Sequence, residues 1–204
     1  RMEFEAHPFS LGVLVDSVLS VMRIRAEDKG VHLRTELPEP DTVDYVGDSL
    51  RIRQVLFNLV GNAVKFTLQG EVRPVVRSTP DGLRFEVHDS GIGISEDDLS
   101  RLFSQFVQVD SSTSRKFGGT GLGLVISRKL VEGMLGTMGV ASELGRGSCF
   151  WFELPLVQVS KRLKADHASL VLPTDASTER APLVQSATGG AVSDASGESV
   201  VAAI

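Results

Sequence analysis

The chain has 204 residues, which is enough for one domain of ordinary size or for one domain with a tail. Its net charge of −5 offers no basic surface for nucleic acid, and its single cysteine, Cys149, excludes an internal disulfide and fits a reducing cytosol. No apolar run could cross a bilayer and no signal peptide opens the chain, so we expect this part to be cytoplasmic, without membrane contact. Because the chain begins with Arg1 and not with Met, we expect it to be part of a longer protein.

The N-terminal quarter of the chain predicts one helix and two short strands. Ser10 is placed to cap a helix over residues 11–29, whose apolar side chains recur every three or four positions. Gly30 follows as the residue that ends this helix. Residues 31–37 alternate between apolar and polar and predict a strand, and residues 44–47 predict a second, shorter one.

Residues 48–67 predict the long helix around which the chain is organised. Asp48 is a suitable N-cap, and an apolar stripe at helical spacing predicts a buried face made of Ile52, Leu56, Leu59, Val60 and Ala63. A separate polar stripe consists of Arg51, Gln54, Asn58, Asn62 and Lys65. Asn is a poor helix former, so the presence of Asn58 and Asn62 one turn apart in a helix needs an explanation. The stripe fits either a solvated face or a face turned to a phosphate–metal group.

The middle of the chain predicts a pair of strands followed by a tight turn. Residues 71–76 predict a strand, in which Pro74 indicates a sheet edge or a bulge. Asp81-Gly82 is a hairpin signal, and residues 83–89 alternate cleanly. Residues 90–95 then form a glycine-rich turn.

The following segment predicts a short helix, a long polar loop and a second helix. The helix over residues 96–106 carries Phe103 and Phe106, which we interpret as packing residues at the base of the loop. Residues 107–117 are polar and aperiodic, which is typical of a functional lid or of disorder. Residues 124–135 predict a helix. After it come Gly136, which closes the helix, and two strands over residues 137–142 and 148–154 with a turn at 145–147.

Composition changes near the C-terminus. The last 45 positions contain no aromatic residue, and Ala, Ser, Thr and Gly dominate them. Such a segment has little apolar surface to offset its ordering entropy. We therefore expect a connection over residues 1–8, one domain over 9–157 and a flexible tail or linker over 158–204.

Asp89 and the glycines after it are a candidate base-recognition site. A carboxylate at a strand end can accept a hydrogen bond from an exocyclic amine such as that of adenine. Gly91 and Gly93 would let the purine edge approach the backbone, although glycines more often serve backbone geometry alone. By itself this signal is weak.

Gly119-Thr120-Gly121-Leu122-Gly123 opens the second helix and is a candidate anion site. Backbone N–H groups at a helix N-terminus attract negative charge, and Arg115 just before them could meet a terminal phosphate or be a solvated loop residue. The motif follows a polar loop and not a strand, which argues against a dinucleotide fold. It also lacks the Lys-Ser/Thr of a P-loop.

The order of these motifs closely resembles the catalytic ATP-binding domain of sensor histidine kinases. NLVGNAVKFT resembles the N box of that family, DSGIGI the first glycine box, LFSQFVQV the Phe box and GGTGLGLVISRKLVE the second glycine box. ELGRGSCFWFELPL resembles its closing strand pair, and the style of the boxes is that of hybrid kinases. The resemblance implies a two-layer α/β sandwich of the gyrase, Hsp90, kinase and MutL type (the GHKL or Bergerat fold), with a mixed sheet under helices.

The resemblance also implies site residues and cofactors. Asn62 would be a Mg²⁺ ligand, with Asn58, Lys65 and Arg115 acting at the phosphates of ATP, and Asp89 would hold the adenine amine. The ATP-binding set implied in this way is Asn58, Asn62, Lys65, Phe66, Asp89, Gly91, Ile92, Gly93, Phe103, Gly119, Thr120, Gly121, Leu122 and Gly123. Magnesium bridging the phosphates would stabilise the charge that develops during transfer to a histidine.

The chain departs from the family pattern at two places. No segment matches the helical context of the phosphoacceptor histidine, since His7 lies in the non-helical sequence AHPF. We therefore expect the acceptor on dimerisation helices upstream, in a homodimer that can be membrane-anchored, with a response-regulator receiver domain as partner. MLGTMGV, over residues 134–140, replaces the usual glycine pair and is expected to alter local packing only.

Three further functions share these motifs. Gyrase- or MutL-type ATPases carry a Glu one turn before the metal-binding Asn, where this chain has Asn58, a poor general base. That residue favours a kinase. The motifs are also compatible with a non-catalytic nucleotide-sensing module and with a Ser/Thr kinase of the anti-sigma-factor type.

Overall fold

The computed structural model describes residues 3–38, 43–99, 102 and 122–160. The chain divides into two compact units, residues 1–163 and 164–204, and every described residue lies in the first. Most of the predicted helix over 96–106, the predicted lid over 107–117 and nearly all of the expected tail lie outside the described residues.

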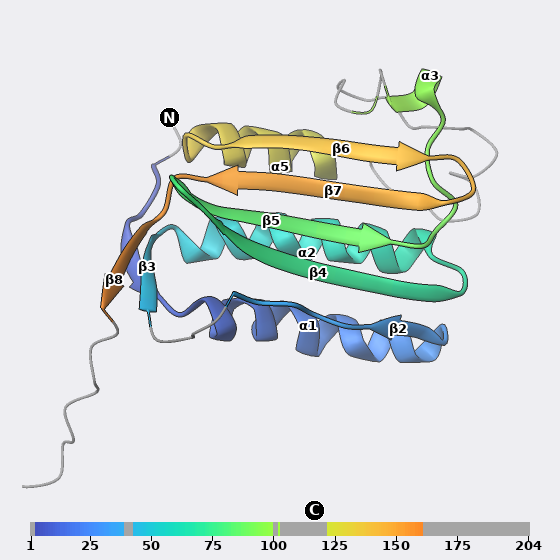
Figure 1. Cartoon of the computed structure of the whole chain (residues 1–204), viewed down its shortest axis with the longest axis horizontal. Helices are drawn as coiled ribbons and strands as arrows, with labels where there is room; N and C mark the ends of the chain where they lie inside the picture. Colours follow the sequence, from blue (N-terminus) through green and yellow to red (C-terminus); the bar gives the residue numbers. More distant parts are fainter. Residues whose placement is uncertain (1–2, 39–42, 100–101, 103–121, 161–204) are drawn as a thin grey trace, which may run out of the picture. The chain divides into compact units, whose positions relative to one another are not determined.

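The first unit is built on a five-stranded mixed sheet. Its strand order is β2-β4-β5-β7-β6, in which only the β2–β4 pair is parallel. The strands are β2 (Val31–Leu33), β4 (Gly70–Thr79), β5 (Gly82–Asp89), β6 (Thr137–Glu143) and β7 (Gly147–Leu154). Three helices, α1 (Leu11–Asp28), α2 (Ser49–Phe66) and α5 (Gly123–Gly133), lie on one face of this sheet, and the short α3 (Glu96–Leu99) lies near the end of β6 (Figure 1). The predicted two-layer α/β sandwich with a mixed sheet is confirmed.

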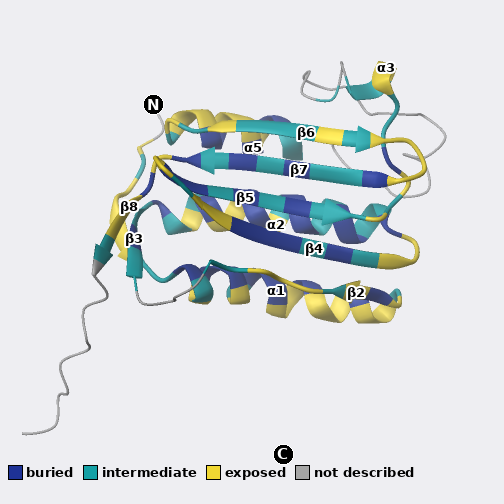
Figure 2. Ribbon diagram, viewed as in Figure 1, coloured by how far each residue is buried: buried dark blue, intermediate teal, exposed yellow. Residues whose placement is uncertain are grey.

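The core lies between the helices and the sheet. The predicted apolar stripe of α2 is fully buried, from Ile52 through Ala63, and so is the corresponding stripe of α1. On the sheet side, the rings of Phe85 in β5 and Phe152 in β7 stack with centroids 4.6 Å apart. Buried and partly exposed residues alternate along β5 and β7 (Figure 2), as expected when only one face of a sheet is covered.

Both predicted helix starts are confirmed by their caps. Ser10 Oγ accepts a hydrogen bond from the Val13 N–H at 3.5 Å, and Asp48 Oδ1 accepts one from the Arg51 N–H at 3.0 Å. The Asp48 carboxylate is buried and also accepts the N–H of Glu5 at 3.2 Å through its other oxygen. None of the helices in the described part of the chain is both long and apolar enough to cross a membrane.

A second sheet of three strands alters both expected domain boundaries. Its order is β1-β3-β8, with β1 (His7–Phe9) and β8 (Val157–Ser160) antiparallel on either side of β3 (Val43–Gly47). The residues placed in the connection and in the tail therefore include strand residues of the folded unit. The reason is that β3 has two open edges, and one strand from each end of the domain satisfies them.

Pro74 lies in neither an edge strand nor a bulge, so that expectation is wrong. It sits in β4, between β2 and β5, and pairs in register with Val87. Its missing N–H faces the side on which β2 has already ended at Leu33. There the predicted strand over 31–37 continues only as an isolated bridge of Glu36 with β4, in which the Glu36 N–H donates to the Pro74 carbonyl at 3.0 Å.

The C-terminus of α5 places a leucine in the left-handed region. The Gly136 N–H donates to the Val131 carbonyl at 2.9 Å and the Leu135 N–H to the Glu132 carbonyl at 3.0 Å, the pattern of a Schellman motif. Leu135, with φ +62°, therefore occupies the position that usually carries Gly. Gly136 is needed for a different reason, because a Cβ there would lie 2.2 Å from the Glu153 carbonyl oxygen.

We expect Leu135→Gly to raise the free energy of unfolding by about 0.5–1 kcal/mol. The substitution removes the strain of a left-handed leucine, about 1–2 kcal/mol. It also makes the unfolded chain more flexible, so folding costs somewhat more conformational entropy, but this effect is smaller. Little burial is lost, since Leu135 is 84% exposed. Urea denaturation at constant m measures the change. Leu68→Gly, at an exposed position with no positive φ, is the control and should destabilise; equal destabilisation by both variants would contradict the prediction.

Candidate functional site

A cavity of about 240 Å³ opens where α2 and β5 end. Its walls come from these two elements, the turn after β5, α3, the start of α5 and the β6–β7 hairpin. The lining is mainly apolar and consists of Asn62, Ala63, Phe66, Asp89, Ile92, Gly93, Ile94, Ser95, Asp98, Leu102, Leu124, Leu144, Ser148 and Phe150. A concave, largely apolar space with few polar groups is typical of a small-molecule site.

Asp89 places a carboxylate in the wall of this cavity. It is the last residue of β5 and lies opposite Ser148 of β7 in the antiparallel register. Its Oδ1 accepts the Gly91 N–H at 2.9 Å. Burial raises the pKa of the Asp89 carboxyl, and this effect exceeds the opposing effect of the Gly91 and Ser148 N–H groups. The result is a fixed, partly desolvated hydrogen-bond acceptor.

The two glycines after Asp89 are required by the protein's own backbone. A Cβ on Gly91 would lie 2.7 Å from the Phe66 carbonyl oxygen, and one on Gly93 would lie 2.0 Å from that of Glu143. Gly93 also has φ +67°. Ile92 and Gly93 line the cavity, whereas Gly91 contributes the N–H that holds Asp89. The turn is therefore wedged between the end of α2 and the end of β6.

Both asparagines of α2 line a groove between α1 and α2, but their other neighbours differ. Asn58 Nδ2 donates to Ser127 Oγ on α5 at 3.0 Å, and its Oδ1 lies close to Gly123, where a Cβ would be 2.5 Å away. Asn58 thus connects α2 to the first turns of α5. Asn62, one turn on, lines both the cavity and a groove between α1 and α2. The polar stripe is not simply a solvated helix face.

The C-terminal end of α2 is held by Lys29, the C-cap residue of α1. Lys29 Nζ donates to the carbonyls of Val64, Lys65 and Thr67 at 2.6, 2.9 and 2.8 Å. Burial lowers the pKa of this ammonium group. Its charge also complements the negative end of the helix dipole. Lys29 therefore fixes the residues that border the cavity, although no sequence motif pointed to it.

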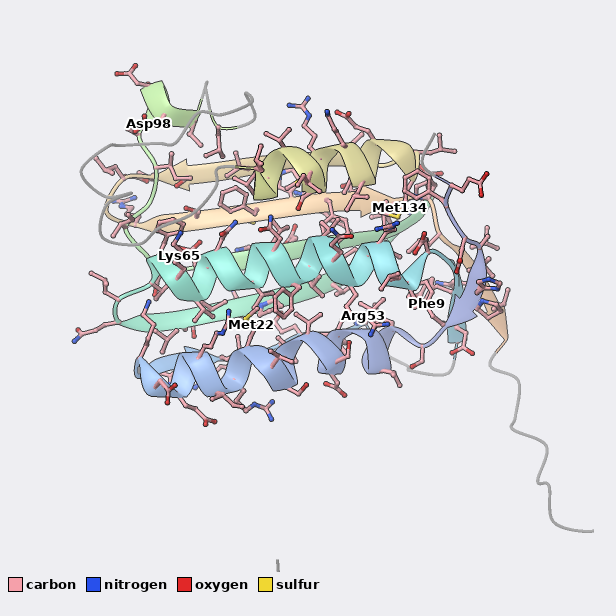
Figure 3. The ribbon with its side chains drawn as sticks, turned by 180° about the vertical axis from the view of Figure 1, so that it is seen from behind. Phe9, Met22, Arg53, Lys65, Asp98 and Met134 are labelled. Atoms are coloured by element: carbon pink, nitrogen blue, oxygen red, sulfur yellow. The ribbon has the colours of Figure 1, made fainter. Side chains whose placement is uncertain are left out.

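Lys65 and Phe66 meet at the cavity rim. Lys65 Nζ lies 4.8 Å from the centroid of the Phe66 ring, and Phe66 lines the cavity. Figure 3 shows Lys65 near the end of α2 and Asp98 on α3 at the same end of the domain. The structure thus brings Asn62, Phe66, Asp89, Ile92 and Gly93 together, with Lys65 beside them.

The phosphate side of the predicted site is only partly described. Leu122 is the N-cap residue of α5 and Gly123 its first residue. Phe103, Arg115, Gly119, Thr120 and Gly121 lie outside the described residues.

Several residues that border the site were not predicted from the sequence. They are Lys29, Ile94, Ser95, Asp98, Leu102, Leu124, Ser127, Leu144, Ser148 and Phe150. Ser148 could have been found, because pairing the predicted strands over 83–89 and 148–154 antiparallel places it opposite Asp89. Leu144 and Ser127 carried no local signal, since each meets the site only through tertiary packing.

Comparison with known proteins identifies the family. Residues 47–158 match the family model described as histidine kinase-, DNA gyrase B- and HSP90-like ATPase. The chain belongs to this family. The matched region begins just before α2 and ends in β8, so it contains the whole cavity.

Individual relatives place the domain among sensor histidine kinases. The chain is 41% identical over 161 residues to the signal transduction histidine-protein kinase BarA of Escherichia coli strain K12, covering 76% of this chain and 18% of BarA. The solved structure of full-length ShkA in complex with AMPPNP is 37% identical with a TM-score of 0.70, covering 80% of this chain and 34% of that one. The nucleotide-free catalytic domain of the histidine kinase ThkA is 30% identical with a TM-score of 0.63, covering 76% of this chain and 96% of that domain.

These likenesses confirm the resemblance drawn from the four boxes. The region of the chain that the structure describes is a catalytic domain of the sensor histidine kinase type. The chain spans about a fifth of the length of BarA, 18%, so most of such a protein lies beyond this region.

Proposed function

We propose that this domain binds ATP with Mg²⁺ and positions the γ-phosphoryl group for transfer to a histidine outside this chain. The observation that carries the proposal is the cavity at the end of β5, with the half-buried carboxylate of Asp89 in a mainly apolar wall. The cavity adjoins the polar stripe of α2 through Asn62, which belongs to both surfaces. A base site and a phosphate–metal site would therefore lie next to each other.

The base would be held by Asp89 and by apolar contacts. The carboxylate accepts a hydrogen bond from the exocyclic amine of adenine, while Phe66, Ile92 and Ile94 supply apolar surface to the ring. Gly93 shapes the turn beside it, and the Gly91 N–H keeps the carboxylate aimed at the cavity. The AMPPNP bound to ShkA supports a triphosphate as the class of ligand.

The metal would be held by Asn62. Mg²⁺ prefers hard oxygen ligands and usually keeps waters and phosphate oxygens around one or two protein ligands, so one amide oxygen fits it. Asn58 is committed to Ser127 through its amide nitrogen, which leaves its oxygen on the α5 side, where it would act beside the phosphates. When bound, the ion would neutralise negative charge that develops on the phosphates. Lys65 would add a positive charge at the same end of α2.

The remaining predicted ATP contacts complete the proposal. Gly119, Thr120, Gly121, Leu122 and Gly123 would surround the phosphates at the start of α5, with Arg115 at the terminal phosphate and Phe103 beneath the loop. The N-terminal end of α5 lies against Asn58, which supports a phosphate position between α2 and α5.

Phosphoryl transfer is favoured over hydrolysis by Asn58. A hydrolase of this family needs a carboxylate at that position to activate water, and an amide is a poor general base. The hydrogen bond from Asn58 to Ser127 gives the amide a structural role instead. We infer that the acceptor histidine lies on upstream dimerisation helices of a homodimer, that a receiver domain accepts the phosphoryl group next, and that this domain is cytoplasmic.

We expect Asp89→Asn to weaken ATP binding roughly ten- to a hundredfold, because an amide donor would face the adenine amine. A buried mispaired polar group costs about 1–3 kcal/mol. Calorimetry on the purified chain measures the affinity. Asp98→Asn is the matched control, since Asp98 also lines the cavity but its Oδ2 already accepts from Ser95 at 2.7 Å, and it should change the affinity little. Unchanged affinity in Asp89→Asn would reject the assignment.

We expect Asn62→Ala to abolish the strengthening of ATP binding by Mg²⁺ while the fold stays intact. The reason is the loss of the amide oxygen that would hold the ion. Titrations of ATP with Mg²⁺ and with a chelator measure the difference, and circular dichroism checks the fold. Gln54→Ala, on the same stripe but exposed and away from the cavity, should keep the Mg²⁺ effect. An unfolded Asn62→Ala protein would make Asn62 structural.

The test of the function itself uses γ-labelled ATP. We expect the chain alone to bind ATP·Mg²⁺, to hydrolyse it very slowly and to take up no label, since a positioned phosphoryl group without an acceptor stays unreacted. Adding the upstream dimerisation helices of its own protein should yield acid-labile phosphohistidine. Vigorous ATP turnover by the chain alone would indicate an ATPase. Acid-stable label on Ser or Thr of a partner would indicate an anti-sigma-type kinase. No phosphorylation even with the helices present would indicate a nucleotide-sensing module.

A further inference from the structure

The face of the large sheet that carries no helix holds three metal-ligating side chains. Helices α1, α2 and α5 lie on the opposite face (Figures 1 and 3). Glu86 and His88 are two residues apart on β5, so they point to the same side, and Cys149 of β7 lies directly opposite His88 in the register. The strand pairing of β5 with β7 therefore determines where all three lie.

The three ligand atoms are close enough to share one ion. His88 Nε2 lies 2.9 Å from Glu86 Oε2 and 3.8 Å from Cys149 Sγ, and all three atoms lie within 4.8 Å of one another. Bonds of about 2.0–2.3 Å to a tetrahedral Zn²⁺ place neighbouring ligand atoms about 3.3–3.8 Å apart. The separations in the structure, from 2.9 Å to at most 4.8 Å, bracket this spacing.

The neighbours of Glu86 support one particular oxygen as the ligand. Arg84 Nε donates to Glu86 Oε1 at 2.6 Å, which orients the carboxylate and leaves Oε2 turned to His88. Such outer contacts orient ligands in known metal sites. The Glu86 side chain is only 13% exposed and that of His88 33%, so both are partly desolvated.

The charges around the cluster permit a dication. Arg84 and Arg73, which would repel it, have carboxylate partners of their own, since Arg84 contacts Glu153 at 2.6 Å and Arg73 contacts Glu36 at 2.8 Å. Among the described cations, Arg77 is the one that must turn away; it lies 3.8 Å from Glu86 Oε2 and its side chain is 60% exposed, so it can turn into solvent.

The Cys149 thiol must lose its proton to ligate an ion, because the thiolate is the metal ligand. Burial, together with the charge of Glu86, raises the pKa of Cys149. Coordination replaces the S–H bond by an S–metal bond and releases the proton to solvent. One thiolate and one carboxylate then balance the two positive charges of the ion.

We propose that Glu86, His88 and Cys149 bind a divalent cation of the zinc class, with solvent in the fourth position. A thiolate and an imidazole select such ions over Mg²⁺ and Ca²⁺, so this site is chemically distinct from the one assigned to Asn62. It does not depend on the proposed function. His88 comes just before Asp89 and Cys149 just after Ser148, and both Asp89 and Ser148 line the cavity. A bound ion would therefore connect β5 to β7 directly behind the cavity.

The test is titration of the untagged, metal-free, reduced chain with Co²⁺, followed by competition with Zn²⁺. Cys149 is the single cysteine of the chain, so a thiolate-to-cobalt charge-transfer band can only come from it. We expect one ion per chain, a tetrahedral spectrum and displacement by Zn²⁺. Cys149→Ser should lose the band, and His88→Gln and Glu86→Gln should each weaken binding at least tenfold.

The control is His32→Gln, on the exposed side of β2, which should bind like the unaltered chain. Circular dichroism checks that each variant is folded, and the conservative Cys149→Ser and His88→Gln changes keep the result interpretable if Glu86→Gln disrupts the Arg84 contacts. Absence of the charge-transfer band would overturn the proposal. Co²⁺ binding of unchanged affinity in His88→Gln would overturn it too, because the histidine would then not be a ligand.

Discussion

Helix α2 is held at each end by a charged side chain: its own N-cap at one end and a lysine from outside the helix at the other. Asp48 caps its N-terminus, and Lys29, the C-cap residue of α1, donates hydrogen bonds to three carbonyls at its C-terminus. Hydrogen bonds to charged groups are stronger than those between neutral groups, and these two are partly or wholly shielded from water. The position of Asn62 and Phe66 at the cavity depends on them, because both residues lie in the last two turns of α2.

The cavity exists because several backbones approach closely at one end of the sheet. Gly91 and Gly93 let the turn after β5 contact the end of α2 and the end of β6, and the Gly145 N–H donates to the Ile92 carbonyl at 2.8 Å. Gly123 lets α5 approach Asn58. Gly91, Gly93 and Gly123 each lack a Cβ that would otherwise meet protein atoms, so these three glycines first of all make close backbone contacts possible.

The segment that leads into the domain contacts the ends of both helices that border the site. The N–H of Glu5 donates to Asp48 at the start of α2, and the ring of Phe4 lies where a Cβ on Gly133, at the end of α5, would be 2.3 Å away. Phe9 packs near Tyr45 in the small sheet, which β8 completes on the other side. Entry and exit of the chain are thus both anchored on β3, a feature that the expected boundary at residue 9 had missed.

Local sequence determined the helix starts, the main strands of the large sheet and the fold class. Caps at Ser10 and Asp48, the apolar stripe of α2 and the alternation over 83–89 each depend on residues a few positions apart, and all are seen in the structure. The order of the boxes determined the family for the same reason, since each box is a contiguous run. Pro74 shows the limit of this reasoning, because whether a proline can be accommodated depends on where the neighbouring strand ends.

Only the tertiary structure decided which distant residues meet. Helix packing places Lys29 at the end of α2 and lets Ser127 accept a hydrogen bond from Asn58, and strand register brings Glu86 and His88 beside Cys149. The left-handed conformation of Leu135 was likewise decided by the way α5 ends and turns into β6. In the sequence, this position is visible only as a leucine where the family usually has a glycine. Contacts between residues far apart in the chain carry no periodic signal, so they become visible only when the sheet and the helices are assembled.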